Sequence, residues 1–257
     1  LLGLVAVAAW ALPRAEYPRP QCERQDWVNL NGEWSYTFDF VGSGMEKKLH
    51  ESRGFDGRIT VPFCPESKLS GVQYTDFINN IWYQRQIQMP TEWAGRNVML
   101  HFGAVYYNAA VYVDGKLAGR HFGGSTSFAI DVTRFVADGK PHSLVVHAYS
   151  DTRTGKQPAG KQNMRKDQFE CMYTRCTGIW QTVWLEFVPQ THVEKVRYTV
   201  DEENGSVTIA ATLSGSGTLQ AEAYYEGEPM GSAQVCSSGG QAILTVKLKE
   251  THLWEVG

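Results

Sequence analysis

Short runs in which apolar and polar residues alternate recur along most of this chain, and they constrain its fold more than any other feature. In the clearest run, every second residue from Trp34 to Phe40 is aromatic, directly after an Asn31-Gly32 turn. A period of two residues is typical of a β-strand with one buried face. Similar runs lie at 59–63, 81–89, 98–102, 105–113, 128–132, 144–148 and 183–187. Because no amphipathic helical pattern separates them, the spacing predicts an all-β protein that begins with a jelly-roll β-sandwich.

The stretch Tyr173–Phe187 joins a polar loop to one of these strands. Positions 183, 185 and 187 are apolar and alternate with 182, 184 and 186, which predicts a half-buried strand. Thr177-Gly178 offers the turn before it, since glycine accepts a positive φ. Loops held by a rigid sheet often carry binding residues. The alternative is that Trp180 and Trp184 are ordinary packing residues.

Two long segments without apolar periodicity, 67–80 and 152–174, interrupt the strands. Long loops in compact domains commonly line a functional site. Asp76, Asp167 and Glu170 lie in these loops and are the carboxylates that could serve one. The alternative is that they are solvated loop charges, since no spacing or apolar surrounding marks a catalytic pair.

Pro189 marks a domain boundary, and strand-like alternation resumes beyond it at 193–200, 207–213, 219–225 and 242–248. The pattern predicts a jelly-roll domain over 17–188 and an Ig-like β-sandwich over 189–257. An Ig-like sandwich takes about 100 residues. We therefore expect the second domain to be incomplete at its C-terminus.

Composition and motifs exclude several function classes. The net charge of −3, with scattered basic residues, gives no indication of nucleic-acid binding. No phosphate-binding glycine loop, nucleophile elbow or zinc-protease motif occurs, so we expect no cofactor. The five cysteines lack zinc-ligand spacing, so we expect no metal site. Cys171 and Cys176 could form a small loop disulfide or remain free thiols.

An apolar leader occupies residues 1–16, where Leu1–Leu12 is uninterrupted by charge. It is too short for a membrane span, which needs about 20 residues, so no span is expected. It fits the apolar part of a truncated signal peptide, which favours a secreted or periplasmic protein over a cytoplasmic one.

Several segments, in order along the chain, resemble the N-terminal portion of glycoside hydrolase family 2, the β-galactosidase, β-glucuronidase and β-mannosidase group. They are Tyr17-Pro-Arg-Pro-Gln21, Leu30-Asn-Gly-Glu-Trp34, Val61-Pro-Phe-Cys-Pro-Glu-Ser67, Ile81-Trp-Tyr-Gln-Arg85, Val111-Tyr-Val-Asp-Gly115, His121-Phe-Gly-Gly124, Gly160-Lys-Gln162 and Thr177-Gly-Ile-Trp-Gln-Thr-Val-Trp-Leu-Glu186. The resemblance implies a galactose-binding-like jelly roll, then an Ig-like sandwich, then a TIM barrel with two catalytic glutamates that perform retaining hydrolysis of a β-glycoside.

The chain departs from that family pattern at the chemistry. It contains no Asn-Glu dipeptide, which carries the family's acid/base glutamate, and it leaves no room for a barrel of at least 200 residues. No catalytic residue is therefore carried over. The resemblance implies a non-catalytic part of a β-galactosidase-like enzyme whose partner is a carbohydrate substrate. A homo-oligomer is compatible with it.

By the same resemblance, the loops Gln73–Trp82 and Lys161–Gly178 rim the active site of the barrel. Their candidate sugar-binding residues are Asp76, Asn79, Asn80, Asp167, Glu170, Tyr173 and Arg175. Arg175 has an alternative role, which is to brace the turn before Ile179. The competing function for the whole chain is a stand-alone carbohydrate-binding or scaffold module without hydrolase activity.

Overall fold

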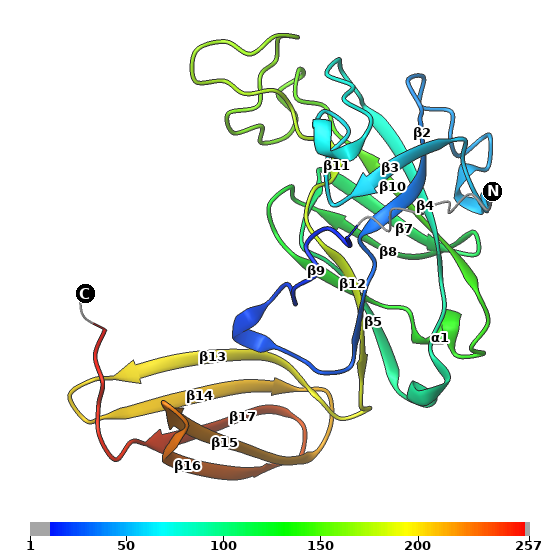
Figure 1. Ribbon diagram of the computed structural model, residues 1–257. Helices are drawn as coiled ribbons and strands as arrows, with labels where there is room; N and C mark the ends of the chain where they lie inside the picture. The colour runs from blue at the N-terminus through cyan, green and yellow to red at the C-terminus, as the bar shows by residue number, and fades with distance from the viewer. Residues whose placement is uncertain (1–10, 255–257) are drawn as a thin grey trace, which may run out of the picture. The chain divides into compact units, whose positions relative to one another are not determined.

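The computed structural model describes residues 11–254, so the first ten residues of the expected leader lie outside the described part. The chain forms two compact units, one up to Phe187 and one from Val188 onward (Figure 1). Strands are the main regular elements of each unit. The helical elements of the described residues are short: η1 (Pro20–Cys22), η2 (Leu49–Glu51), η3 (Lys68–Ser70), η4 (Thr91–Trp93) and α1 (Thr133–Val136).

The first unit contains two main sheets and one small one. The six-stranded sheet has the order β3-β2-β4-β10-β7-β8, with β2 (Gly32–Phe38), β3 (Gly57–Val61), β4 (Asn80–Ile87), β7 (Asn108–Val113), β8 (Lys116–Phe122) and β10 (His142–Tyr149). The four-stranded sheet has the order β1-β12-β5-β9, with β1 (Trp27–Asn29), β5 (Asn97–Phe102), β9 (Phe128–Asp131) and β12 (Val183–Val188). A small sheet pairs β6 (Val105–Tyr106) with β11 (Gly178–Ile179).

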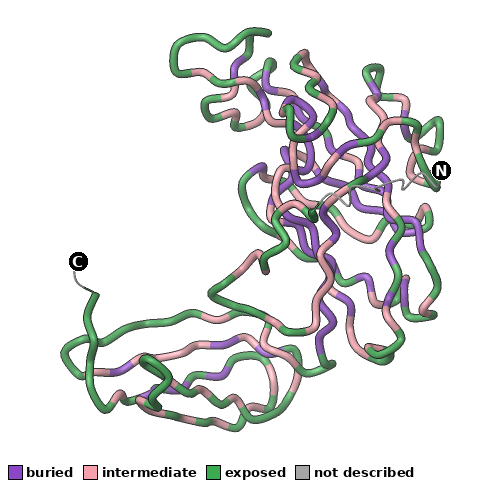
Figure 2. The backbone as a smooth tube through the Cα atoms, viewed as in Figure 1, coloured by how far each residue is buried: buried purple, intermediate pink, exposed green. Residues whose placement is uncertain are grey.

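One hydrophobic core lies between the two main sheets, as the buried segments in Figure 2 show. Its side chains include Trp34, Tyr83 and Leu144 from the six-stranded sheet and Leu100, Phe102 and Leu185 from the four-stranded sheet. Each large apolar side chain buried in this way contributes roughly 2 kcal/mol. The predicted jelly-roll sandwich is confirmed. A turn at Asp114-Gly115, where both residues have positive φ, joins β7 to β8.

β12 differs from its prediction because it is buried on both faces. Val183, Leu185 and Phe187 enter the core as expected, but Trp184 and Glu186 on the other face are only 1% and 2% exposed. The N-terminal arm, residues 17–24, covers that second face. The expectation of a half-buried strand is therefore wrong, because a distant segment supplies the cover.

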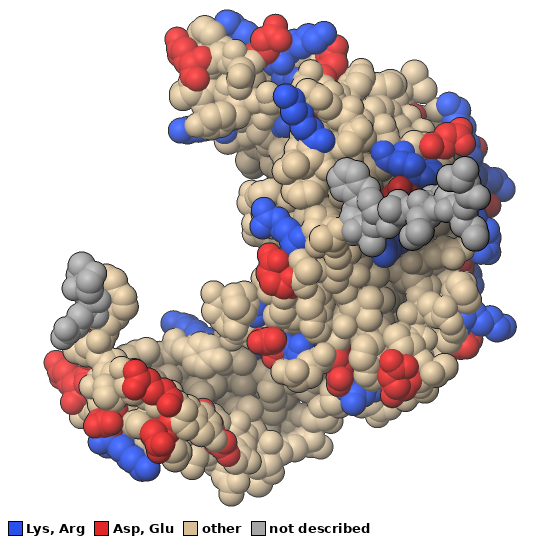
Figure 3. Space-filling model, in the orientation of Figure 1, with Lys and Arg blue, Asp and Glu red and all other residues tan. Residues whose placement is uncertain are grey.

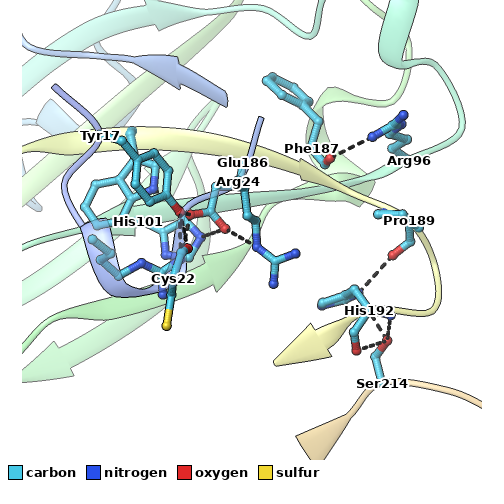
Figure 4. Close-up of polar contacts among 12 residues, drawn as sticks. Tyr17, Cys22, Arg24, Arg96, His101, Glu186, Phe187, Pro189, His192 and Ser214 are labelled. Atoms are coloured by element: carbon cyan, nitrogen blue, oxygen red, sulfur yellow. Dashed lines mark hydrogen bonds and ion pairs between the residues drawn. The ribbon is translucent and has the colours of Figure 1, made fainter. Parts of the chain in front are cut away.

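Glu186 is the point at which the N-terminal arm attaches (Figure 4). One carboxylate oxygen accepts hydrogen bonds from the Tyr17 hydroxyl at 2.5 Å and from Arg19 at 2.6 Å. The other lies 3.0 Å from Nε of Arg24 and 3.2 Å from Nε2 of His101. Burial opposes the charged form, but hydrogen bonds from His101 and its neighbours outweigh burial and hold the pKa of Glu186 well below its usual range.

The second unit is a smaller arrangement of two sheets. β13 (Val193–Asp201), β14 (Ser206–Leu213) and β17 (Gly240–Lys247) form one sheet, and β15 (Gly217–Tyr225) pairs with β16 (Glu228–Ser237) in the other. Its hydrophobic core cluster contains Ala211, Leu213 and Ala242, with Val193, Leu219 and Val235 packed against them, and Leu244 and Val246 of β17 are also buried.

The sequence left open whether Cys171 and Cys176 are bonded to each other. All five cysteines are unbonded, so Cys171 and Cys176 are free thiols. Among residues 11–254, no group of three or more His, Cys, Asp or Glu side chains is arranged to hold a metal ion. Within the same range, no helix has the length and apolar character needed to cross a membrane.

Candidate functional site

Two loops of the first unit meet beside β4 and β11. The β3–β4 loop comprises residues 62–79, and the long loop comprises residues 150–177 between β10 and β11. The long loop is the yellow-green segment at the top of Figure 1, and charged side chains of both signs gather there in Figure 3. Both loops contain residues that the sequence analysis selected.

Arg175 holds the two loops together. Its guanidinium donates hydrogen bonds to four backbone carbonyls, those of Asn163, Arg165 and Lys166 in the long loop and that of Thr75 in the β3–β4 loop. The side chain is almost fully buried, with 4% of the residue exposed. Arginine suits this task because its planar group presents five N–H donors in a fixed geometry. Arg175 thus occupies a bracing position between loops.

A stack of cations on Phe77 reinforces this junction. The guanidinium carbons of Arg153 and Arg175 each lie 4.3 Å from the centre of the Phe77 ring. The cavity beside them, which Asn79 and Thr177 also line, has a volume of about 10 Å³. That volume holds a single water molecule. A sugar ring cannot enter it, so these two loops can contact a carbohydrate only through their outer surface.

A buried carboxylate fixes the end of the long loop. Glu66 is 7% exposed and accepts the Thr177 hydroxyl at 2.6 Å and the Thr177 N–H at 3.2 Å. Burial raises the pKa of Glu66. The next residue, Gly178, has φ of +73°, and a Cβ there would lie 2.2 Å from the Tyr83 hydroxyl oxygen. Only glycine fits, so the positive φ expected at Gly178 is observed, but the predicted turn is not, because Gly178 begins β11.

The exposed candidates lie on the outside of the braced loops. Asp76 pairs with Nζ of Lys166 at 3.2 Å, and its pKa is lowered first by the Phe77 N–H and then by Lys166. Asp167 and Glu170 are exposed in the long loop. Tyr173 is 60% exposed, so its ring is free to stack on a ligand.

The two asparagines occupy different environments. Asn79 donates to the Ser150 carbonyl at 3.0 Å, beside the small cavity. Asn80 is 9% exposed and its amide oxygen lies 2.9 Å from Nε2 of His147, within the six-stranded sheet. The structure therefore groups Asn79 with Arg175 through the cavity lining, whereas Asn80 is engaged with β10.

The tryptophans of the adjoining segment are bound within the fold. Trp184 stacks on His101 with ring centres 4.8 Å apart, and Trp180 donates its indole N–H to the Gly124 carbonyl at 2.7 Å. These contacts favour packing for Trp184 and an anchored, half-buried position for Trp180.

Sequence reasoning missed Glu66, Thr177 and Arg153 as site-forming residues. Glu66 lies in one of the segments that resemble family 2, but nothing in its neighbours indicates burial. Its role depends on a residue 111 positions away. Thr177 was selected only as part of a turn. No local pattern could have identified these contacts.

The buried carboxylates of the described residues are all committed to the fold. Asp39 accepts the N–H groups of Ser43 and Gly44 at 3.0 and 2.7 Å. Glu66 holds Thr177, and Glu186 holds the N-terminal arm. Glycosidases need one carboxyl as acid and another as base or nucleophile. Buried acids with this many internal donors are suited to support and not to that chemistry.

Comparisons with known proteins agree with this architecture. A family model described as "Glycosyl hydrolases family 2, sugar binding domain" matches residues 28–189. The chain is 28% identical to a β-glucuronidase from Canis lupus familiaris over 93% of its own length and 40% of that protein. It is 27% identical to a β-galactosidase from Thermoanaerobacter pseudethanolicus over 74% of its length and 25% of that protein.

Solved structures share the fold. A β-glucuronidase from Ruminococcus gnavus, in complex with C6-substituted uronic isofagomine, superposes with a TM-score of 0.70 at 20% identity. The match covers 94% of this chain and 42% of that one. The chain thus spans about 40% of the length of the β-glucuronidases it matches.

Proposed function

The chain belongs to the sugar-binding-domain family of the family 2 glycosyl hydrolases, and from that membership we propose that it is the N-terminal, non-catalytic part of a retaining β-glycosidase. The observation that carries the proposal is the family match over residues 28–189 in a chain that spans less than half of its matched relatives. In the proposed enzyme, two carboxylates outside this chain cleave the glycosidic bond through a glycosyl-enzyme intermediate.

The proposed substrate class is a β-glucuronide or a β-galactoside, as in the names of the relatives. The charge of the long loop favours the uronide. Residues 150–177 contain six Lys and Arg against three Asp and Glu. A loop with excess positive charge raises the local concentration of an anionic substrate. A galactoside, which is neutral, would gain nothing from this charge.

The two loops divide the proposed work between support and contact. Arg175 and Glu66 position the loops, since their polar atoms bind backbone carbonyls and Thr177. We propose that the exposed Asp76 and Asp167 accept hydrogen bonds from sugar hydroxyls and that the exposed Tyr173 ring stacks on an apolar sugar face. The sugar therefore meets a surface whose shape is fixed before it binds, which reduces the entropic cost of binding.

Steady-state kinetics of the full-length enzyme on aryl β-glucuronides and β-galactosides test this proposal. Tyr173→Ala should raise KM roughly tenfold with kcat little changed, because a stacking contact contributes to ground and transition states alike. Tyr198→Ala, at a 54% exposed tyrosine of β13, is the matched control. If Tyr173→Ala leaves KM unchanged on every substrate, the proposed contact between these loops and the sugar is contradicted.

A second candidate, a stand-alone carbohydrate-binding module, is favoured by the exposed rings of Phe169 and Tyr173, which are 46% and 60% exposed in the same loop. Exposed rings on one loop suit sugar binding without catalysis. Calorimetric titration of this chain with oligosaccharides distinguishes the two. Saturable binding by the chain alone favours the module, and binding that requires the full-length enzyme favours the glycosidase.

A further inference from the structure

Cys64 and Cys176 lie next to each other because the β3–β4 loop and the long loop are joined beside them. Glu66, two residues after Cys64, accepts both hydrogen bonds from Thr177, the residue after Cys176. The Cys64 side chain is the largest influence that raises the pKa of the Cys176 thiol, and it also acts on the Glu66 carboxylate, so the three groups lie near one another. Both cysteines are half-buried and neither forms a disulfide.

We propose that Cys64 and Cys176 form a redox-sensitive thiol pair, which a small-molecule disulfide such as oxidised glutathione converts into a disulfide bond between the two loops. The proposal concerns the chain itself and does not depend on the glycosidase activity. Its geometric basis is the double contact between Glu66 and Thr177, which holds the two cysteines in place before any oxidant arrives.

The reaction proceeds by two thiol–disulfide exchanges. The Cys64 thiolate attacks one sulfur of oxidised glutathione, forms a mixed disulfide and releases the first glutathione thiolate, which takes up a proton. The Cys176 thiol then loses its proton and attacks the Cys64 sulfur, which releases the second glutathione. The protein loses two electrons and two protons, and one molecule of oxidised glutathione becomes two thiols.

The order of attack follows from the surroundings of the two sulfurs. The neighbouring Cys64 side chain, together with burial and the charge of Glu66, raises the pKa of Cys176. Cys176 is therefore the weaker initial nucleophile at neutral pH, because the thiolate is the reactive form. Once Cys64 is in the mixed disulfide, the hydrogen bonds between Glu66 and Thr177 hold Cys176 beside it, so the second step is intramolecular.

Cys171 provides a matched control within the same loop. Cys171 is exposed. It lies in a turn that is closed by a hydrogen bond of 2.8 Å from the Met172 N–H to the Phe169 carbonyl. An exposed thiol is open to glutathione but lacks the Glu66 contact that brings Cys64 to Cys176. Glutathione on Cys171 should therefore remain as a mixed disulfide and dissociate on mild reduction.

Peptide mapping by mass spectrometry tests the pair. The folded chain is incubated with oxidised glutathione, alkylated under native and then denaturing conditions, and digested. We expect a cross-linked peptide containing Cys64 and Cys176, with its mass lower by two hydrogens, and the same product in Cys171→Ser. In Cys64→Ser, Cys176 should become accessible to alkylation only on denaturation and should form no cross-link.

The outcomes that contradict the proposal are equally distinct. Recovery of Cys64 and Cys176 as alkylated thiols after oxidation would overturn it, and so would a dominant Cys171–Cys176 cross-link. A stable mixed disulfide on Cys64 would overturn it as well, because closure by Cys176 would then have failed. If Cys64→Ser does not fold, the wild-type and Cys171→Ser maps alone decide between these outcomes.

Discussion

Thr177 and Glu66 are joined by two hydrogen bonds across 111 residues of sequence, with the hydroxyl at 2.6 Å and the N–H at 3.2 Å from the carboxylate. Both residues are buried. This contact ties the end of the long loop to the β3–β4 loop, beside the hydrogen bonds that Arg175 donates to both loops.

Replacement of Glu66 by Ala should lower the free energy of unfolding by about 2 kcal/mol, because it leaves two buried donors of Thr177 without an acceptor. Urea unfolding followed by tryptophan fluorescence measures the change. Glu170→Ala, at an exposed position of the long loop, should change stability by less than about 0.5 kcal/mol. Equal effects of the two substitutions would contradict the anchoring role of Glu66.

Replacement of Arg175 by Lys should loosen the long loop although charge is kept. A lysine cannot reproduce the forked donation to carbonyls in both loops. We expect a loss of about 1–3 kcal/mol in stability and faster tryptic cleavage after Lys161 and Lys166. Arg165→Lys, at an exposed position, controls for the change of residue type. Unaltered cleavage in Arg175→Lys would show that the brace is not needed.

Replacement of Glu186 by Gln should destabilise the first unit by about 1.5–3 kcal/mol, since Arg19 and Arg24 lose a charged hydrogen-bond partner but stay partly hydrated at 35% and 30% exposure. It should also change the pH dependence. The pKa of Glu186 is lowered on folding, so its contribution is present above the unfolded pKa of about 4.3 and is lost as pH falls. The variant should therefore lose less stability than wild type between pH 5 and pH 3.

Glu33→Gln is the control for that measurement because its side chain is 75% exposed. Its stability profile with pH should overlay that of the wild type. If Glu186→Gln loses as much stability as the wild type between pH 5 and pH 3, the acid sensitivity belongs to other carboxylates.

His147 should remain neutral in the folded state at pH values well below the usual pKa of histidine. Burial lowers its pKa to about 4, and its ring stacks on Trp82 with centres 4.1 Å apart. The unfolded chain takes up this proton near pH 6.5, so stability falls as pH decreases from about 6.5 toward 4. NMR titration of the ring proton should give a midpoint near 4. A midpoint above pH 6 would contradict the prediction that burial lowers the pKa of His147.

Most of the strands could be predicted from the sequence, because the alternation of apolar and polar residues indicates which face of a strand is buried. The predicted strand Val105–Val113 is nevertheless divided into β6 and β7, which pair with different strands, β11 and β10. β8 and β16 were not identified from alternation, since they contain polar residues, glycines and Pro229. Their hydrogen bonds to a single neighbouring strand define them instead.

The site was less accessible to sequence reasoning than the fold. The long loops were located by their lack of periodicity, and Arg175 was selected together with its bracing alternative. The contacts that fix the loops, Glu66 with Thr177 and Arg175 with Thr75, join residues about 100 positions apart. No local pattern encodes such pairs. The binding roles of Asp76, Asn79, Asn80, Asp167, Glu170 and Tyr173 remain predictions.

The central claim is that this chain supports a glycosidase without carrying its chemistry. The most direct test measures release of 4-nitrophenol from 4-nitrophenyl β-glucuronide and β-galactoside by the purified 257-residue chain and by the full-length enzyme. We predict turnover by the full-length enzyme and none by the chain alone. Turnover by the chain alone, retained through further purification, would contradict the account.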